Sequence, residues 1–238
     1  MIGGCSNTFF NDSGFRGAIV STLLMSSVNI TKEGFIIASA GTKLSQMLSF
    51  ATKSNLGVCP ELFGIPGSVG GAIRNNAGAF GKEIADVFLE ASFFDLSTSE
   101  VITLSRKEMK FSYRNSIVQE KNIFFLCGKF KAYESEYTKE IERLKYFSTI
   151  RKEKQPQEPS LGSYFKKTDK HSASELIDRA GLKGYSIGGA RVSPKHAGFI
   201  VNYKNASTDD IIQLAEHIKQ TVSKIYGINL DNEAEFQT

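Results

Sequence analysis

Glycine is concentrated in one stretch of this chain, from Gly64 to Gly81, which reads GIPGSVGGAIRNNAGAFG. Glycines at this density let successive backbone N–H groups point at one anion, because no Cβ atom blocks its approach. A pyrophosphate suits such a loop, and Ser68 and Asn76 can add side-chain hydrogen bonds. A purely structural glycine-rich turn explains the composition equally well. The spacing matches neither the dinucleotide-fold signature G-x-G-x-x-G nor the P-loop signature G-x-x-x-x-G-K-[ST].

A second glycine-rich loop stands at the start of the chain, where Met1 and Ile2 lead directly into GGCSN (3–7). A loop of this kind normally leaves a strand that is already part of a sheet. We therefore expect the chain to begin inside a domain, as a fragment or an abnormally short version of a longer protein.

Three further segments carry polar side chains that suit a site. Residues 113–116 read YRNS, and an arginine beside a tyrosine and a serine can hold a carboxylate. Ser163 stands in the segment GSYFK (162–166), and Glu233 lies close to the C-terminus. Taken singly, each of these segments is more typical of an exposed polar surface than of a site. The three histidines show no metal-ligand spacing, so no metal site is predicted.

The pattern of apolar residues predicts the elements that must position these segments. In the first part of the chain, short apolar runs predict strands at Gly17–Val20 and Phe35–Ser39. A helix is expected to follow, with Thr42 as its N-cap. Its buried positions are predicted to be Leu44, Met47, Leu48 and Ala51. Strands are expected at 87–104 and 123–133, and a second helix at 134–150.

Residues 151–160 are charged and contain two of the five prolines, which is typical of a domain junction. Beyond it, helices are expected at Ser174–Ala180 and Thr208–Tyr226, with strands near 185–192 and 198–202 between them. The pattern as a whole predicts two α+β domains.

Composition excludes several classes of protein. Of the 238 residues, 41% are hydrophobic and 23% charged, unlike disordered, collagen-like or fibrous chains. The net charge of +4 is small and the basic residues are scattered, which disfavours nucleic acid as the main partner. Three distant cysteines form no disulfide framework, and no stretch has the roughly 18 apolar residues of a membrane span. The start does not resemble a signal peptide. We expect a cytoplasmic monomer without membrane contact.

Taken together, the ordered motifs resemble the UDP-N-acetylenolpyruvoylglucosamine reductase family, bacterial cell-wall flavoenzymes also called UDP-N-acetylmuramate dehydrogenases. The motifs that carry the resemblance are GGCSN (3–7), GIPGSVGGA (64–72), NAGAFG (76–81), YRNS (113–116), R-x-x-K-x-P (151–156), GSYFK (162–166), GLKGYSIGGARVSPKHAGFIVN (181–202) and L-x-x-E (230–233). Their order is that of the family, and they cover essentially the whole chain.

The resemblance implies an α+β fold, in which the second subdomain of a vanillyl-alcohol-type FAD-binding domain is followed by a smaller α+β substrate-binding domain. It implies an FAD-binding region at 1–150, with the first subdomain absent, and a UDP-sugar domain at 151–238. The compact run 163–196 resembles the shorter family variant, which lacks a substrate-covering tyrosine loop.

The resemblance also implies the reaction, in which NADPH and FAD reduce UDP-N-acetylglucosamine enolpyruvate to UDP-N-acetylmuramate for peptidoglycan synthesis. By motif position, Ser163 matches the serine that donates a proton, while Arg114 and Glu233 match residues that stabilise the developing enolate. The implied FAD contacts are Gly3, Gly4, Cys5, Ser6, Asn7, Gly64, Ile65, Pro66, Gly67, Ser68, Gly70, Gly71 and Asn76. The implied substrate contacts are Tyr113, Arg151, Lys154, Lys166 and His196.

Three positions depart from the family pattern. Cys5 replaces the third glycine of the usual GGGSN, at a place that favours positive φ. Lys167 stands where asparagine is frequent, and Glu235 reverses the charge of a frequent arginine. Two alternatives stay open. One is a truncated, catalytically impaired UDP-sugar-binding relative that retains FAD poorly. The other is an oxidase with covalently tethered FAD, which is disfavoured because neither glycine loop contains a histidine and Cys5 is the only candidate tether.

Overall fold

Two separate hydrophobic cores form in this computed structural model, which describes residues 1–238. The chain divides into two compact units, and each unit takes two segments of sequence. Unit 1 consists of Met1–Gly4 and Ile19–Arg151, and unit 2 consists of Cys5–Ala18 and Lys152–Thr238. The chain therefore passes between the units three times, the last time near the C-terminal end of a long helix.

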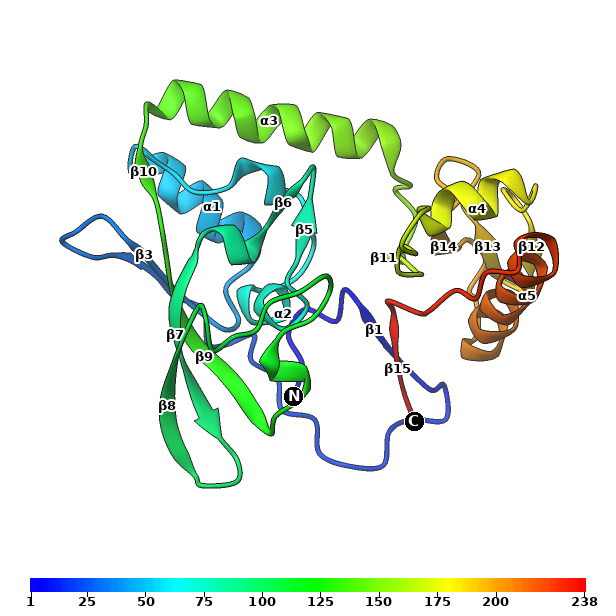
Figure 1. The fold of residues 1–238 in the computed structure, drawn as a ribbon, viewed down its shortest axis with the longest axis horizontal. Coiled ribbons are helices and arrows are strands. Elements are labelled where there is room, and N and C mark those ends of the chain that lie inside the picture. The colour runs from blue at the N-terminus through cyan, green and yellow to red at the C-terminus, as the bar shows by residue number, and fades with distance from the viewer. The chain divides into compact units, whose positions relative to one another are not determined.

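Unit 1 is built on a five-stranded antiparallel sheet with the order β2-β3-β9-β7-β8 (Figure 1). Its strands are β2 (Val28–Ile30), β3 (Ile36–Ser39), β7 (Phe88–Asp95), β8 (Glu100–Ser105) and β9 (Ile123–Phe130). Two small antiparallel pairs accompany the sheet, β4 (Leu56–Gly57) with β10 (Tyr133–Glu134) and β5 (Gly78–Ala79) with β6 (Lys82–Glu83).

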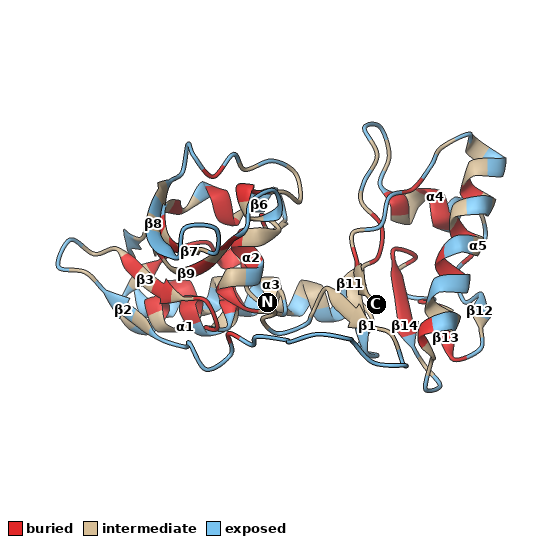
Figure 2. Cartoon of the chain, turned by 90° about the horizontal axis from the view of Figure 1, so that it is seen from below, coloured by how far each residue is buried: buried red, intermediate tan, exposed pale blue.

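Helices α1 (Leu44–Lys53) and α2 (Val69–Arg74) pack on this sheet and enclose the core of unit 1. Figure 2 shows buried residues on the three inner strands β3, β9 and β7 and on these two helices. In α1, Leu44, Met47, Leu48 and Ala51 are all buried, as their helical spacing predicts. The predicted strands at 35–39, 87–104 and 123–133 are confirmed by β3, β7, β8, β9 and the short β10.

Two local predictions are wrong. Residues 17–20 form no strand: Ile19 and Val20 are 46% and 53% exposed, and only an isolated bridge between Ile2 and Ser21 pairs the chain nearby. A strand needs a partner along its length, and this segment has one only at a single point. Thr42 does not cap α1, because its hydroxyl exchanges hydrogen bonds with the backbone N–H and carbonyl of Ser27 (3.1 and 2.9 Å).

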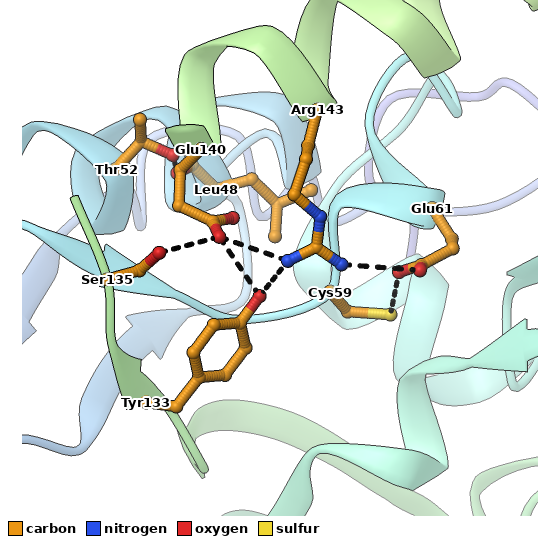
Figure 3. A network of polar contacts seen from close by, with 8 residues as sticks. All are labelled: Leu48, Thr52, Cys59, Glu61, Tyr133, Ser135, Glu140 and Arg143. Atoms are coloured by element: carbon orange, nitrogen blue, oxygen red, sulfur yellow. Dashed lines mark hydrogen bonds and ion pairs between the residues drawn. The ribbon is translucent and has the colours of Figure 1, made fainter. Parts of the chain in front are cut away.

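Helix α3 (Tyr137–Lys154) begins in unit 1 on a network of polar side chains centred on the buried Glu140 (Figure 3). The Glu140 carboxylate is only 1% exposed and accepts hydrogen bonds from Tyr133, Ser135 and Arg143. Arg143 also donates to the Tyr133 hydroxyl and forms an ion pair with Glu61 (3.7 Å). The network therefore ties α3 to the 3-10 turn Pro60–Leu62, which leads directly into the main glycine-rich stretch.

Unit 2 contains a four-stranded antiparallel sheet with the order β11-β14-β13-β12. Its elements are β11 (Ser160–Ser163), α4 (Ala173–Arg179), β12 (Ser186–Ile187), β13 (Ala190–Val192), β14 (Phe199–Asn202) and α5 (Thr208–Tyr226). Both predicted helices and both predicted strand regions of this part are confirmed. A separate parallel pair joins β1 (Thr8–Phe10) to β15 (Glu235–Gln237).

Helix α5 has strong signals at both ends. Ser207 and Asp210 form a reciprocal capping box, and Gly227 ends the helix in the left-handed conformation. The Asp210 carboxylate also accepts a hydrogen bond from the Gly189 N–H (2.9 Å), in the turn before β13. One carboxylate thus fixes both the start of α5 and a hairpin turn of the sheet.

We predict that Arg143→Met destabilises the protein more than the double variant Glu140→Gln/Arg143→Met does. The single change leaves a buried carboxylate without its cation, which costs about 1–3 kcal/mol, whereas the double change leaves a neutral amide among the same donors. Urea unfolding of the variants measures both values. Equal loss in the single and double variants would show that the ion pair contributes nothing beyond packing.

Asp210→Asn is predicted to lower the melting temperature at neutral pH. Backbone hydrogen bonds from Gly189 and Ser207 hold the pKa of Asp210 below its ordinary 3.8. Because the folded-state pKa is lowered, the charge stabilises the fold above pH 3.8, and this contribution is lost as the pH falls through the folded-state value. The difference from the unmodified protein should therefore shrink in strong acid. Asp209→Asn, in the same helical turn, is the control and should leave the melting temperature nearly unchanged at both pH values.

Candidate functional site

The two glycine-rich segments lie against each other in unit 1, although more than sixty positions separate them in the sequence. A Cβ atom on Gly3 would stand 2.2 Å from the Oγ of Ser68, and one on Gly4 would stand 3.3 Å from the Cα of Gly67. Only glycine allows the first approach, since real Cβ contacts are never that short. The two segments therefore form one double loop of exposed and half-buried backbone, which fits the pyrophosphate of a dinucleotide.

Some polar groups of the longer loop form hydrogen bonds within the protein, which fix the conformation of the loop. Ser68 is 3% exposed and its hydroxyl accepts a hydrogen bond from the Gly71 N–H (3.3 Å), as the N-cap of α2. The Gly70 N–H donates to the carbonyl of Ala40 (3.0 Å). The N–H groups of Gly70 and Gly71 thus donate to partners within the protein, whereas the Ser68 hydroxyl accepts one hydrogen bond and keeps its own hydrogen as a donor.

Cys5 has φ +50°, inside the left-handed region that glycine adopts without strain. This agrees with the expectation that the position favours positive φ. A non-glycine residue there costs on the order of 1 kcal/mol.

Arg114 occupies a tight turn with unusual backbone geometry. Ser112 and Asn115 exchange backbone hydrogen bonds (3.2 and 3.1 Å) across Tyr113 and Arg114, and Arg114 has φ +53°. The Arg114 guanidinium lies 5.1 Å from the ring centre of Tyr113 and donates to the carbonyl of Gly78 (3.3 Å). Strained conformations of this kind are concentrated at functional positions.

Two neighbouring side chains support this turn, of which only Ser116 was singled out from the sequence. Gln119 donates to the carbonyls of Arg114 (3.0 Å) and Arg74 (2.9 Å), and the buried Ser116 hydroxyl donates to the same Arg74 carbonyl (2.9 Å). Ser116 belongs to the YRNS motif, so the sequence pattern already includes it. Gln119 lies in a 3-10 turn (Ile117–Gln119) and carries no motif.

In unit 2, three distant segments meet beside Ser163. Ser163 ends β11, and the carbonyl of the next residue, Tyr164, accepts a hydrogen bond from the Glu233 N–H (2.8 Å). The Asn7 side chain donates to the carbonyl of Glu233 (2.9 Å), and the Asn7 carbonyl accepts from the Glu235 N–H (2.9 Å). The structure therefore places Ser163 and Glu233 on adjoining segments, with Asn7 next to Glu233.

The loop of His196 borders the same strand, because Ser163 on β11 pairs with Phe199 on β14. The Nδ1 atom of His196 accepts a hydrogen bond from the Gly198 N–H (3.1 Å), so a neutral ring carries its proton on Nε2. Burial lowers the pKa of His196 below its ordinary 6.5, with smaller effects from Lys183 and Asp178. At pH 7 this side chain is a neutral donor.

The remaining expected contacts are placed as follows. Arg151 belongs to unit 1, where its guanidinium donates to the carbonyls of Phe63 and Glu61 (both 3.0 Å) and lies over Phe80. Its guanidinium is thus a support for the glycine-rich loop. Lys154 is exposed at the end of α3, and the Lys166 N–H donates to the Asp231 carbonyl (2.9 Å). No group of His, Cys, Asp or Glu side chains is arranged to hold a metal ion, and no helix meets the length and apolarity that crossing a membrane requires.

We predict that Gly3→Ala destabilises the protein by about 1–3 kcal/mol, the usual cost of overpacking. Adding Ser68→Ala removes the atom that the new methyl group would strike, so the double variant should lose less stability than the two single changes together. Thermal unfolding of the four proteins measures this coupling. Strictly additive losses would contradict the close approach of the two loops.

Comparison with known proteins identifies two family models along the chain. Residues 1–105 match the FAD binding domain family, and residues 155–237 match the family described as UDP-N-acetylenolpyruvoylglucosamine reductase, C-terminal domain. UDP-N-acetylenolpyruvoylglucosamine reductase of Caldicellulosiruptor saccharolyticus is 40% identical over 99% of this chain and 76% of its own length. The enzyme of that name from Caldanaerobacter subterraneus is 41% identical over 97% of this chain and 76% of its own length.

A crystal structure of UDP-N-acetylenolpyruvylglucosamine reductase from Thermus caldophilus superposes with a TM-score of 0.84 at 29% identity. The match covers 98% of this chain and 83% of that one. It confirms the expected α+β fold, with an FAD-binding domain followed by the reductase C-terminal domain. The double glycine loop, the ordered motifs and these matches agree, and the chain belongs to the UDP-N-acetylenolpyruvoylglucosamine reductase family.

Proposed function

We propose that this protein reduces UDP-N-acetylglucosamine enolpyruvate to UDP-N-acetylmuramate, with FAD as its bound cofactor and NADPH as the electron source. The observation that supports the proposal most directly is the hydrogen bond between the Glu233 N–H and the Tyr164 carbonyl, which ties together the segments of Ser163 and Glu233. Curated relatives that carry the name of this reductase support the same reaction.

The protein's own residues have two tasks in this reaction. Bound FAD supplies the two-electron transfer from NADPH to the enol-ether double bond. The substrate then needs a proton at the carbon next to its carboxylate, and the developing enolate needs stabilisation. Ser163 performs the first task, and Arg114 and Glu233 perform the second.

Ser163 is suited to act as a proton donor only because its position is fixed. A serine hydroxyl is a weak acid, so it transfers a proton only to a strongly basic carbon held within hydrogen-bond reach. Ser163 ends a strand that is paired with β14, and the next two residues, Tyr164 and Phe165, are 2% and 4% exposed. The backbone on both sides of the hydroxyl is therefore held by a sheet and a core.

The binding roles of the remaining residues follow from their surroundings. Gly3, Gly4, Gly64 and Gly67 supply exposed or half-buried backbone for the FAD pyrophosphate. Lys154, Lys166 and the Nε2–H of His196 provide cationic or donor groups in unit 2 for an anionic UDP-sugar. In unit 1, Tyr113 contacts the Arg114 guanidinium and is the proposed substrate contact beside it. We propose that the enzyme works as a cytoplasmic monomer.

Ser163→Ala is predicted to leave reduction of the bound flavin by NADPH nearly intact and to slow its reoxidation by the enolpyruvyl sugar by about 100-fold or more. The proton is needed only in the second half-reaction, so the loss should be confined to it. Stopped-flow flavin absorbance measures each half-reaction separately. Ser160→Ala, at the exposed start of the same strand, is the control. Equal slowing of both half-reactions by Ser163→Ala would contradict the assignment.

The truncated, FAD-poor alternative and the covalent oxidase are distinguished by the purified protein itself. The proposed reductase should be yellow, with a flavin spectrum that is released completely on denaturation. A colourless protein would favour the impaired relative, and flavin that stays attached after denaturation would favour a covalent link.

A further inference from the structure

The buried side chain of Asn76 forms a hydrogen bond with the turn that carries Arg114. Ser112 is exposed, and its carbonyl closes the turn by accepting the Asn115 N–H (3.1 Å). The same carbonyl accepts a second hydrogen bond from the Nδ2 of Asn76 (2.9 Å). A type of turn that places a non-glycine residue at positive φ needs such support, because the conformation costs about 1 kcal/mol or more.

Asn76 is completely buried, and every polar part of its side chain has a partner. Its Nδ2 donates to the Ser112 carbonyl and to the Oε2 of Glu83 (2.7 Å), and its Oδ1 accepts from the Ala85 N–H (3.3 Å). The two amide hydrogens face acceptors and the oxygen faces a donor, so the orientation of the amide is fixed. The amide therefore has no hydrogen left for a cofactor, and its hydrogen bonds point to another role.

No other side chain of this size meets the same three partners. Aspartate would place a carboxylate against Glu83 and against the Ser112 carbonyl, with no hydrogen to donate to either. Leucine would leave the Ser112 carbonyl and the Ala85 N–H without this partner inside the protein. The hydrogen-bond partners in the turn and in the loop around Glu83 thus require an amide side chain at position 76.

The segment of Asn76 contacts the arginine turn at two points. The Asn76 side chain holds the Ser112 carbonyl, and two residues further on the Gly78 carbonyl accepts from the Arg114 guanidinium (3.3 Å). Both contacts lie within unit 1. A displacement of this segment would therefore move both the backbone and the side chain of Arg114.

We propose that Asn76 is a positioning residue for the reductase reaction, which holds Arg114 in place through the Ser112 carbonyl. The inference rests on the proposed function, in which Arg114 stabilises the developing enolate. Glu83 assists by accepting the second amide hydrogen and so orienting Asn76. In this role the asparagine of the NAGAFG segment serves the second half-reaction of the enzyme and contributes nothing directly to flavin binding.

The test combines Asn76→Asp with Arg114→Ala in a double-mutant cycle on the full chain carrying FAD. Asn76→Asp should slow flavin reoxidation by the enolpyruvyl sugar by about tenfold or more, and change flavin reduction by NADPH less than about threefold. In the Arg114→Ala background it should have almost no further effect on reoxidation, because its target is already absent. A role in folding alone would not separate the two half-reactions in this way.

A second variant guards against a failure of Asn76→Asp to fold. In Asn76→Asp/Glu83→Gln, the glutamine amide at position 83 can donate to the aspartate at position 76, so the two carboxylates no longer face each other. The hydrogen bond to the Ser112 carbonyl is still missing, because aspartate has no hydrogen to donate. It should retain FAD and still reoxidise slowly. Asp86→Asn perturbs the capping box of the same loop without a contact to Ser112, and should react at normal rates in both halves.

The outcomes separate the inference from the function on which it rests. Additive losses from Asn76→Asp and Arg114→Ala would overturn the inference, and so would loss of flavin from both Asn76 variants. Normal reoxidation in Arg114→Ala alone would overturn the proposed role of Arg114, and the inference with it. Slow reoxidation in Arg114→Ala with normal reoxidation in both Asn76 variants would overturn the inference only.

Discussion

The close approach of Gly3 to Ser68 is the constraint on which the predicted cofactor loop depends. A methyl group at position 3 would stand 2.2 Å from the Ser68 hydroxyl, so the two segments meet only as bare backbone on one side and a small side chain on the other. Ser68 in turn caps α2, which packs against β3 and β9 in the core of unit 1. The geometry of an exposed loop is thus set by a buried hydroxyl and, through it, by the sheet.

The regular elements were largely predictable because their signals are local. The start of α5 is encoded by Ser207 and Asp210, its end by Gly227, and its buried face by residues at helical spacing. The predicted strand at 17–20 does not form because no neighbouring strand pairs with it, and a local sequence pattern does not show such a partner. Thr42 has the right type for an N-cap, yet a partner fifteen positions earlier, Ser27, takes its hydroxyl. Such competition between partners depends on the tertiary structure.

For the candidate site, the motifs predict which segments contribute, but the hydrogen-bond partners of each side chain come only from the structure. Arg151, expected at the substrate, holds the carbonyls of Glu61 and Phe63 at the start of the glycine-rich loop. Asn76, expected at the cofactor, donates to the carbonyl of Ser112 in the turn of Arg114. A motif shows that certain residue types occur together, whereas a buried donor is assigned only when its acceptor is known. Hydrogen bonds across 36 and 88 positions carry that information here.

Hydrogen bonds of the same kind account for several buried polar residues of unit 1. Glu140, Ser116 and Asn76 are at most 1% exposed, and each has hydrogen-bond partners within unit 1. A buried polar group with all its partners holds one arrangement, because any movement leaves donors or acceptors unpaired at a cost of about 1–3 kcal/mol each. Apolar packing tolerates small shifts more readily. The proposed role of Arg114, stabilisation of a short-lived enolate, requires a guanidinium that is already in position, and a support of paired polar groups suits that role better than a hydrophobic one.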